Sequence, residues 1–322
     1  MPGQRSPVLR VILGPTAAGK SSIAMYLARN HDGAIVSADS RQIYRGFDIG
    51  TAKPTAEDQA DVPHFGLDVA DPGERYSAAR WVEGATRWIQ EARAMGRTPV
   101  VVGGTGFYVR ALVEPLFSAP YMDAGQRRTL ELIMRDWSLE ELRRWTRALD
   151  PERAHLGPAQ LRRAIETALL TGQRLSDLHR AAPTKPPVPA RYLVVDPGVR
   201  LLRDRIEQRV DQMFDSGWLE EVRALMRTVP DDAPAWNASG YDAVRQLVRG
   251  ELEPAVARER VIVATRQYAK RQRTWLRHQL ADCDVTLLDP TAPGALELAV
   301  HWWSSASVPT LAVTTPISEH AP

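Results

Sequence analysis

A glycine loop close to the N-terminus limits the fold of this chain more than any other feature. Residues 14–21 read Gly-Pro-Thr-Ala-Ala-Gly-Lys-Ser and match the pattern G-x-x-x-x-G-K-[ST]. The loop follows the apolar run at 8–13, which predicts a buried strand, and it precedes a segment with helical periodicity. In this order, the loop amides and the positive end of the helix surround an anion. The pattern therefore predicts an α/β domain that binds a diphosphate or polyphosphate.

Each position of the loop has an expected part in that binding site. Glycine lets the backbone turn inward, the Lys20 ammonium group neutralises phosphate charge, and the Ser21 hydroxyl is a ligand for Mg²⁺. We therefore expect Lys20 to act in catalysis and Ser21 to hold the metal. The residues expected to bind the diphosphate are Gly14, Pro15, Thr16, Ala17, Ala18, Gly19, Lys20 and Ser21.

Short apolar runs recur along the chain and extend this prediction to a whole sheet. Runs with the length of buried parallel strands lie at 8–13, 34–37, 99–102, 192–195 and 285–288, and helical periodicity follows each of them. This alternation predicts an α/β fold, a parallel sheet flanked by helices like that of the P-loop NTPases. Near 202–226, Ile206, Val210, Met213 and Phe214 share one face of a helix and are expected to pack in the core.

One region breaks the alternation and is expected to be an all-helical insertion. It contains no convincing strand, it is rich in Arg, Leu, Glu and Ala, and it ends in a proline-rich linker. The tail is rich in Ser, Thr and Pro, which is typical of disorder. The predicted boundaries are a first part of the core at 1–117, the insert at 118–189, a second part of the core at 190–303 and a disordered tail at 304–322.

Composition excludes several classes of protein. Cys283 is the only cysteine, so an intramolecular disulfide and a cysteine-based zinc site are excluded, and a cytoplasmic location is expected. The run at 8–13 is too short for a signal peptide, and no stretch approaches the roughly 20 apolar residues that span a bilayer. Hydrophobic residues at 44% and charged residues at 25% are typical of a soluble globular protein, which we expect to be a monomer.

Two polar residues follow predicted strands and are candidates for chemistry. Asp39 comes after the second strand, and Thr105 comes after the run at 99–102. Ligands bind at the carboxyl ends of strands in open α/β sheets. A carboxylate there can accept a proton from a nucleophile, and a hydroxyl can donate to a leaving phosphate. The alternative is an ordinary turn or helix cap for both residues, and position alone leaves both readings open.

A larger set of motifs resembles the bacterial tRNA dimethylallyltransferases over most of the chain. Besides the glycine loop it includes Asp-Ser-Arg-Gln-Ile-Tyr at 39–44, Asp-Ile-Gly-Thr-Ala-Lys-Pro at 48–54 and Thr-Arg-Gln-Tyr-Ala-Lys-Arg-Gln at 265–272. Shorter matches lie at 62–64, 71–72, 76–78 and 102–106. The glycine loop occurs in many folds, whereas its combination with the motifs at 48–54 and 265–272 is highly specific.

The resemblance implies a reaction and roles for individual residues. The donor would be dimethylallyl diphosphate with Mg²⁺, and the acceptor would be the exocyclic amine of the adenosine 3′ of the anticodon in tRNA. Asp39 would be the general base and Thr105 a catalytic hydrogen-bond donor. The insert would contact the anticodon stem-loop. No membrane partner is expected.

Basic residues supply candidates for contact with the tRNA. Arg266, Lys270 and Arg273 recur at helical spacing on one face, although a charged face of this kind is also typical of a solvated helix. Members of the family often have a basic residue at the position of Gln160 and further basic residues on both sides of Gly240. This chain instead has Gln160, Asn237 and Asp242. The residues expected to bind tRNA are Asp39, Ser40, Arg41, Gln42, Thr105, Arg127, Gln160, Arg163, Arg266, Lys270 and Arg273.

Three other functions are compatible with a glycine loop of this kind. A small-molecule kinase and an adenylate prenyltransferase are the enzyme alternatives, and a nucleotide-switched RNA-binding protein is the non-enzymatic one. The strand at 99–102 continues into Gly-Gly-Thr-Gly without a carboxylate, which disfavours a hydrolase that orients Mg²⁺ with an acidic residue. The arginine-rich insert favours a macromolecular acceptor over a free nucleotide.

Overall fold

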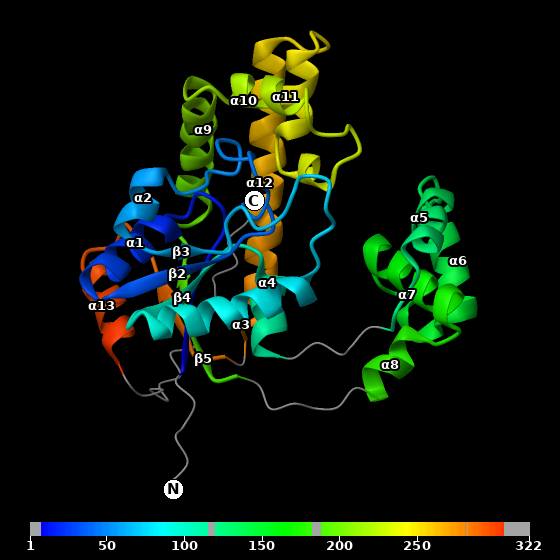
Figure 1. Ribbon diagram of the computed structural model, residues 1–322, viewed down its shortest axis with the longest axis horizontal. Coiled ribbons are helices and arrows are strands. Elements are labelled where there is room, and N and C mark those ends of the chain that lie inside the picture. Colours follow the sequence, from blue (N-terminus) through cyan, green and yellow to red (C-terminus); the bar gives the residue numbers. More distant parts are fainter. Residues whose placement is uncertain (1–7, 115–119, 182–187, 282, 306–322) are drawn as a thin grey trace, which may run out of the picture. The chain divides into compact units, whose positions relative to one another are not determined.

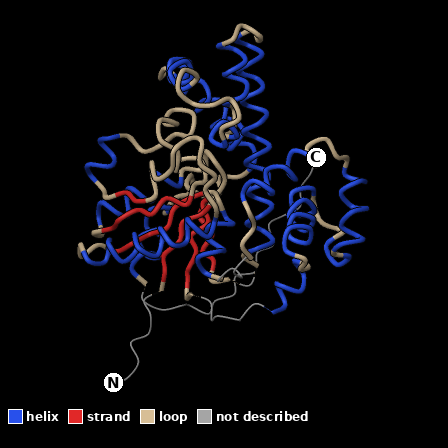
Figure 2. The backbone as a smooth tube through the Cα atoms, turned by 45° about the vertical axis from the view of Figure 1, so that its right-hand side comes forward, coloured by secondary structure: helices blue, strands red, loops and turns tan. Residues whose placement is uncertain are grey.

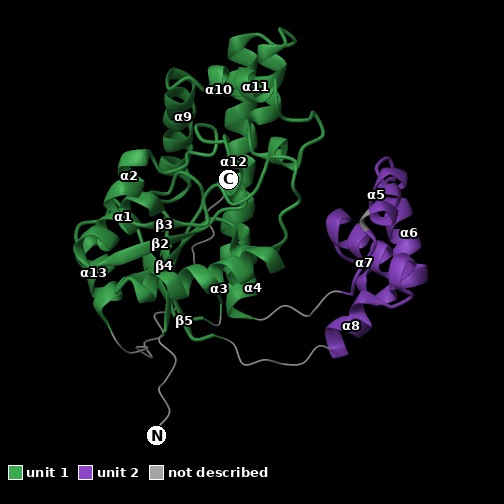
Figure 3. Ribbon diagram, viewed as in Figure 1, with its two compact units in different colours: residues 1–114, 187–322 green, residues 115–186 purple. Residues whose placement is uncertain are grey.

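The chain forms two compact units in the computed structural model, which describes residues 8–114, 120–181, 188–281 and 283–305. One unit combines 1–114 with 187–322, and the other spans 115–186 (Figure 3). The helical insert predicted from the sequence has the bounds 118–189. The expected disordered tail lies outside the described residues from 306 onward. Its first residue, Ser304, is in fact the last residue of a helix, because the helical pattern continues through the tryptophans before it.

The first unit contains a six-stranded sheet in which every pair of neighbouring strands is parallel (Figures 1 and 2). The predicted parallel sheet with flanking helices is therefore confirmed. Its spatial order is β3-β2-β4-β1-β5-β6. The strand β3 has only two residues and was not predicted from the sequence. The strands are β1 (Leu9–Leu13), β2 (Gly33–Ala38), β3 (His64–Phe65), β4 (Thr98–Gly103), β5 (Ala190–Val195) and β6 (Val285–Leu288).

The connections that leave β1 and β4 run in opposite directions along the sheet. β1 and β4 are neighbours in the sheet. The connection through α1 leads from β1 to β2, on the β4 side of β1, whereas the connection that starts with α4 leads from β4 to β5, on the β1 side of β4. Because such crossovers are right-handed, the two helices cover opposite faces of the sheet. Ligands bind where the direction changes in this way. The helices before the insert are α1 (Lys20–Asn30), α2 (Ala56–Asp61), α3 (Ala78–Ala94) and α4 (Gly106–Val113).

A second group of helices lies between β5 and β6, and its longest member is α12 (Pro254–Gln279). This helix packs on α9, α11 and α4. The segment predicted as one helix near 202–226 is two, because Gly217 adopts a left-handed conformation with φ 91° and turns the chain. The other elements are α9 (Val199–Asp215), α10 (Trp218–Leu225), a 3₁₀ turn (Pro234–Asn237), α11 (Tyr241–Val248) and α13 (Ala295–Ser304).

The core of the first unit is built from the buried strands and the apolar faces of these helices. Ile206 and Val210 lie in it, as expected, whereas Met213 and Phe214 pack at its margin. An aromatic cluster continues the core above the strand ends, where the Phe47 ring packs against Tyr241 and Trp236. None of the helices within the described ranges is both long enough and apolar enough to span a membrane.

The second unit is a small helical bundle with a core of its own, formed by Met134, Leu142, Leu161 and Ile165. Local sequence signals define its helices. Ser138 and Glu141 form a reciprocal capping box, and the fully buried Asp150 accepts hydrogen bonds from Ser176. The elements are α5 (Ala124–Ile133), α6 (Leu139–Leu149), a 3₁₀ turn (Pro151–Arg153), α7 (Pro158–Thr171) and α8 (Leu175–Ala181).

Candidate active site

Three loops with chemically active side chains meet at the carboxyl end of the sheet. They follow β1, β2 and β4, three strands that are hydrogen-bonded neighbours in the order β2-β4-β1. The tube in Figure 2 shows loops gathered at one end of the strands. Parallel pairing therefore brings the glycine loop, Asp39 and Thr105 to one edge, although they are far apart in the sequence.

The glycine loop has the backbone conformation of an anion-binding turn. It leaves β1 at Leu13, and α1 begins at Lys20. A Cβ atom on Gly14 would lie 2.2 Å from the Val195 carbonyl oxygen, so only glycine fits there. Ala17 adopts φ 62°, in the left-handed region that costs a residue with a Cβ about 1–2 kcal/mol. Strain of this kind persists where function requires it, which supports the predicted phosphate-binding role.

The Lys20 side chain lies inside the loop that is expected to hold phosphate. Its Nζ donates a hydrogen bond to the Pro15 carbonyl at 2.6 Å. Desolvation and then the positive charge of Arg209 lower the pKa of Lys20 to about 7, although the Asp39 carboxylate acts in the opposite direction. A lysine that is easily deprotonated in the free protein regains its charge when an anion binds, so this site is short of negative charge without a ligand.

Arg209 is a site residue that the sequence did not reveal. It lies on α9, lines the same cavities as Asp39 and Lys20, and its pKa is lowered by desolvation. Among the residues that the structure describes, it forms no hydrogen bond or ion pair. Arg205, one turn earlier, donates to the Ala18 carbonyl at 3.0 Å. The spacing of these two arginines at i and i+4 was a readable signal, but many solvated helices share it.

Asp39 and Thr105 lie just after the ends of the neighbouring strands β2 and β4. The Asp39 Oδ1 atom accepts a hydrogen bond from the Arg41 amide at 2.8 Å, and Oδ2 has no partner among the described residues. The Thr105 Oγ1 atom accepts from the Ser40 amide at 3.0 Å. Asp39 therefore makes a turn contact with one oxygen and keeps the other for a ligand.

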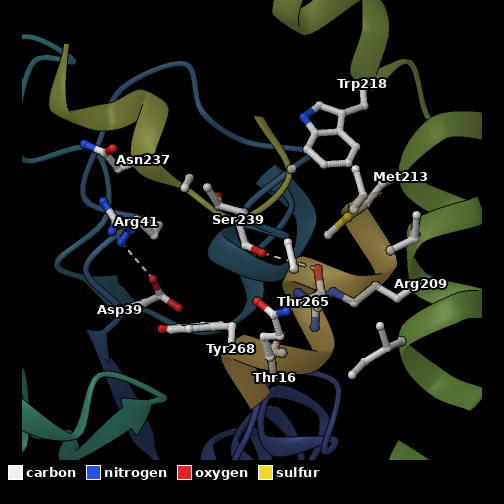
Figure 4. Close-up of a pocket in the computed structure, with 18 of the residues that line it drawn as sticks. Thr16, Asp39, Arg41, Arg209, Met213, Trp218, Asn237, Ser239, Thr265 and Tyr268 are labelled. Atoms are coloured by element: carbon white, nitrogen blue, oxygen red, sulfur yellow. Dashed lines mark hydrogen bonds between the residues drawn. The ribbon is translucent and has the colours of Figure 1, made fainter. Parts of the chain in front are cut away.

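Asp39 lines a cavity of about 410 Å³, shown in Figure 4. Its polar lining includes Thr16, Asp39, Arg41, Arg209 and Tyr268. A second cavity of about 200 Å³ continues from Asp39 to Lys20 and Ser21. The apolar lining of the larger cavity comes from Ile206, Val210, Met213, Trp218, Ala238, Val261 and Ala264. A small planar or apolar group fits beside the phosphate-binding loop.

The motif at 48–54 is a structural support for this cavity. Lys53 is buried and forms ion pairs with Asp48 and Asp68. The Glu221 carboxylate accepts hydrogen bonds from two backbone amides at the start of the motif. Gln42, expected to contact tRNA, has its amide bonded to the carbonyl groups of residues 51 and 52 and its oxygen bonded to Ser37. These contacts hold Gly50 and Thr51 in the cavity wall.

The predicted basic face of α12 is divided by ion pairs. Arg266 pairs with Glu207, and Arg273 pairs with Asp196 at 2.7 Å, so both are held against neighbouring parts of the first unit. Lys270 is exposed. The sequence could not reveal the pairing, because each partner lies more than 50 residues away.

The basic residues of the insert also have partners within their own unit. Arg127 and Arg163 lie at 3.1 Å and 3.6 Å from the buried Glu166 carboxylate. Gln160 accepts a hydrogen bond from the Gly157 amide at 3.0 Å and so caps α7. Glu166 holds the two arginine side chains on one face of the bundle. Their contact with tRNA stays a prediction.

The Ser21 hydroxyl is a candidate ligand for a metal ion beside the glycine loop. Ser21 is exposed in the first turn of α1, lines the cavity with Lys20 and forms no hydrogen bond within the described ranges. No cluster of three or more His, Cys, Asp or Glu side chains suited to a metal occurs there. A single hydroxyl beside a phosphate-binding loop fits a cation such as Mg²⁺, which takes few protein ligands and is also bound by phosphate oxygens of the substrate.

Family models match most of the chain and include the site described above. A model described as IPP transferase matches residues 42–279, and a model described as isopentenyl transferase matches residues 7–64. The tRNA dimethylallyltransferase of an Anaeromyxobacter strain is 45% identical, over 84% of this chain and 92% of its own length. That of Stenotrophomonas maltophilia is 41% identical, over 90% and 95%.

Solved structures have the same fold. The full-length tRNA isopentenylpyrophosphate transferase of Bacillus halodurans is 33% identical, with a TM-score of 0.62 over 88% of this chain and 90% of its own. A eukaryotic dimethylallyltransferase acting on tRNA has a TM-score of 0.74 over 88% of this chain and 74% of its own. Because the second is 24% identical, it bears on the fold alone.

Proposed function

This chain belongs to the IPP transferase family, and from that membership we propose that it is a tRNA dimethylallyltransferase. It transfers a dimethylallyl group from dimethylallyl diphosphate to the exocyclic N6 amine of the adenosine 3′ of the anticodon, and it releases diphosphate. One observation carries the proposal. A single cavity joins a cationic cradle, formed by Lys20 and Arg209, to the Asp39 carboxylate.

The cradle provides the charge that departure of diphosphate requires. When the bond between C1 of the dimethylallyl group and the diphosphate oxygen breaks, negative charge develops on that oxygen. Loop amides, Lys20 and Arg209 would stabilise this charge with groups that are oriented before the reaction begins, which is usually the largest single contribution to catalysis. Thr105 lies at the same edge, and its hydroxyl, which contacts Ser40 Oγ at 3.3 Å, would donate to the departing group. In water, by contrast, no charged groups are held in position around the leaving oxygen.

The carboxylate provides for the proton of the acceptor. The lone pair of an adenine N6 amine is delocalised into the ring, so the amine is a poor nucleophile. As N6 forms its bond to C1, it loses a proton, and Asp39 accepts that proton at its unpartnered oxygen. The amine must leave the base stack of the anticodon loop to reach Asp39, and the cavity of about 410 Å³ has room for an extruded base.

We further propose Mg²⁺ as the metal of the reaction. The Ser21 hydroxyl would hold it together with oxygens of the donor diphosphate. When bound, the ion supplies positive charge that offsets the charge on the leaving group. Lys20 and Arg209 supply their own charge beside it.

Transfer of labelled dimethylallyl diphosphate to unmodified tRNA tests the proposal directly. We expect label in tRNA carrying adenosine 3′ of the anticodon and none in tRNA with guanosine at that position. Label in AMP would instead support an adenylate prenyltransferase. Phosphate transfer from ATP to a small molecule would support a kinase, and tRNA binding without either transfer would support a nucleotide-switched RNA-binding protein.

Replacing Arg209 by alanine is expected to raise the KM for dimethylallyl diphosphate by about 10–10²-fold, because a charge-assisted contact to phosphate is lost. The affinity for tRNA should change little. Steady-state kinetics with varied donor give the KM, and filter binding gives the tRNA affinity. Arg203 provides a matched control on the same helix, since its side chain is exposed. Equal effects of the two substitutions would contradict a role for Arg209 in the cradle.

A further inference from the structure

The buried side-chain amide of Gln272 connects two of the loops that form the site. Gln272 lies on α12 and is 7% exposed. Its Oε1 atom accepts a hydrogen bond from the Thr16 amide at 2.8 Å, and its Nε2 atom donates to the Gly104 carbonyl at 3.0 Å. Thr16 belongs to the glycine loop, and Gly104 precedes Thr105. One side chain therefore joins the diphosphate cradle to the loop that carries the threonine.

The backbone around Gln272 is shaped to admit its amide. A Cβ atom on Gly104 would lie 2.0 Å from Nε2. One turn further along α12, the Trp275 ring lies against Gly106, where an added Cβ would lie 2.2 Å from the ring. The two glycines after β4 thus allow side chains of α12 to approach the strand end closely. A Cβ at Gly104 would displace the Gln272 amide, and one at Gly106 would collide with the Trp275 ring.

Tyr268 lines the same cavity as Asp39, the residue of the third loop. It lies four residues before Gln272, so both side chains project from the same face of α12. Burial, together with the charge of Asp39, raises the pKa of Tyr268 to about 12, and its phenol interacts with Thr105. Tyr268 therefore remains a neutral hydrogen-bonding group at physiological pH. The face of α12 at 268 and 272 therefore contacts the glycine loop and the loop after β4, and it lines the same cavity as Asp39.

We propose that Gln272 is a positioning residue for prenyl transfer, setting the separation between the diphosphate cradle and the loop of Thr105. This inference rests on the proposed function. Alignment of reacting groups is sensitive to displacement, and a misplacement of about 1 Å can cost about 10²-fold in rate. A glutamine suits the task because one end of its amide accepts and the other donates. A glutamate could not donate to the Gly104 carbonyl, and an asparagine is too short to reach both loops.

Kinetics of Gln272→Ala and Gln272→Glu test the assignment. In both variants we expect kcat to fall by about 10–10²-fold, while the affinity for tRNA stays within about twofold. The KM for dimethylallyl diphosphate should change by less than about threefold for alanine, because Lys20 and Arg209 still bind the donor. It should rise further for glutamate, whose charge repels the diphosphate. Gln279→Ala is the matched control, since this exposed glutamine on the same helix contacts Arg110.

A cycle with Gly104→Ala distinguishes positioning from general loss of structure. In the parent protein the added methyl group collides with the Gln272 amide, so Gly104→Ala should lower kcat by about 10-fold or more. In the Gln272→Ala background the methyl group enters vacated space and should have a much smaller effect. Equal effects in both backgrounds, or a parental kcat for Gln272→Ala, would overturn the inference. If the parent protein itself transferred no label to tRNA, the proposed function would fail instead.

Discussion

Asp39→Ala is expected to lower the turnover number for prenyl transfer by about 10²–10⁴-fold, the range that a positioned general base contributes. The carboxylate is fixed by the Arg41 amide through Oδ1, and its other oxygen faces the cavity without a partner among the described residues (Figure 4). The proton that leaves N6 would have no acceptor in the variant. Single-turnover transfer of labelled donor to tRNA measures the effect, and filter binding should show unchanged affinity for tRNA.

Asp39→Asn separates the two roles that this residue combines. Asparagine keeps the shape of the side chain and can still accept the hydrogen bond from the Arg41 amide, but it is not a base. We therefore expect it to be as slow as the alanine variant. If asparagine restored turnover to near the parental rate, Asp39 would be a turn residue, the reading that its sequence position alone left open.

The sheet could be predicted from the sequence because most of its strands, β1, β2, β4 and β5, are buried on both faces. Each apolar run at 8–13, 34–37, 99–102, 192–195 and 285–288 is long enough to stand out, and the glycine loop marks which end of the sheet binds a ligand. The strand β3 escaped prediction because two residues show no periodicity. The split near 202–226 escaped because Gly217 is isolated and lies between two helical stretches.

The site residues that were predicted differ in position from those that were not. Asp39 and Thr105 were predicted because each follows a strand directly, where geometry places a side chain at the ligand edge. Arg209 and Gln272 were not, because each looks like an ordinary polar position on a helix. Their importance depends on tertiary contacts with the glycine loop, 256 residues away in the case of Gln272. Periodicity shows which residues share a face but not what that face contacts.

A charge pattern in the sequence likewise does not show which basic residues of α12 are already paired in the folded protein. A run of cations at helical spacing predicts a face that attracts phosphate. In the folded unit, however, Arg266 and Arg273 are already paired with carboxylates on other elements. An arginine that is paired contributes less to binding a polyanion than one that is free, since its partner must first be displaced. The exposed Lys270 is therefore the stronger candidate for contact with tRNA.

Lys20→Met is expected to lower kcat/KM for dimethylallyl diphosphate by about 10²–10³-fold, the cost of removing one preorganised donor from a developing oxyanion.

The parent protein should also show a pH dependence of kcat/KM that the Lys20→Met variant lacks. Since the pKa of Lys20 is about 7 without a ligand, the side chain is charged below that pH and becomes neutral above it. Binding a diphosphate requires the charged form, so kcat/KM for the donor should fall as the pH rises from about 7 to 9, by up to about tenfold per unit.

Lys20→Arg provides the control for this pH dependence. Arginine keeps a positive charge throughout this range, so its kcat/KM profile should be flat from about pH 7 to 9, even though its larger fork fits the loop less well and lowers the rate. The charges that face Lys20 are those of Arg209 and Asp39, and neither is changed by the substitution. A falling profile that persisted in Lys20→Arg would assign the titration to another group. The lowered pKa of Lys20 would then have no part in recognition of the donor.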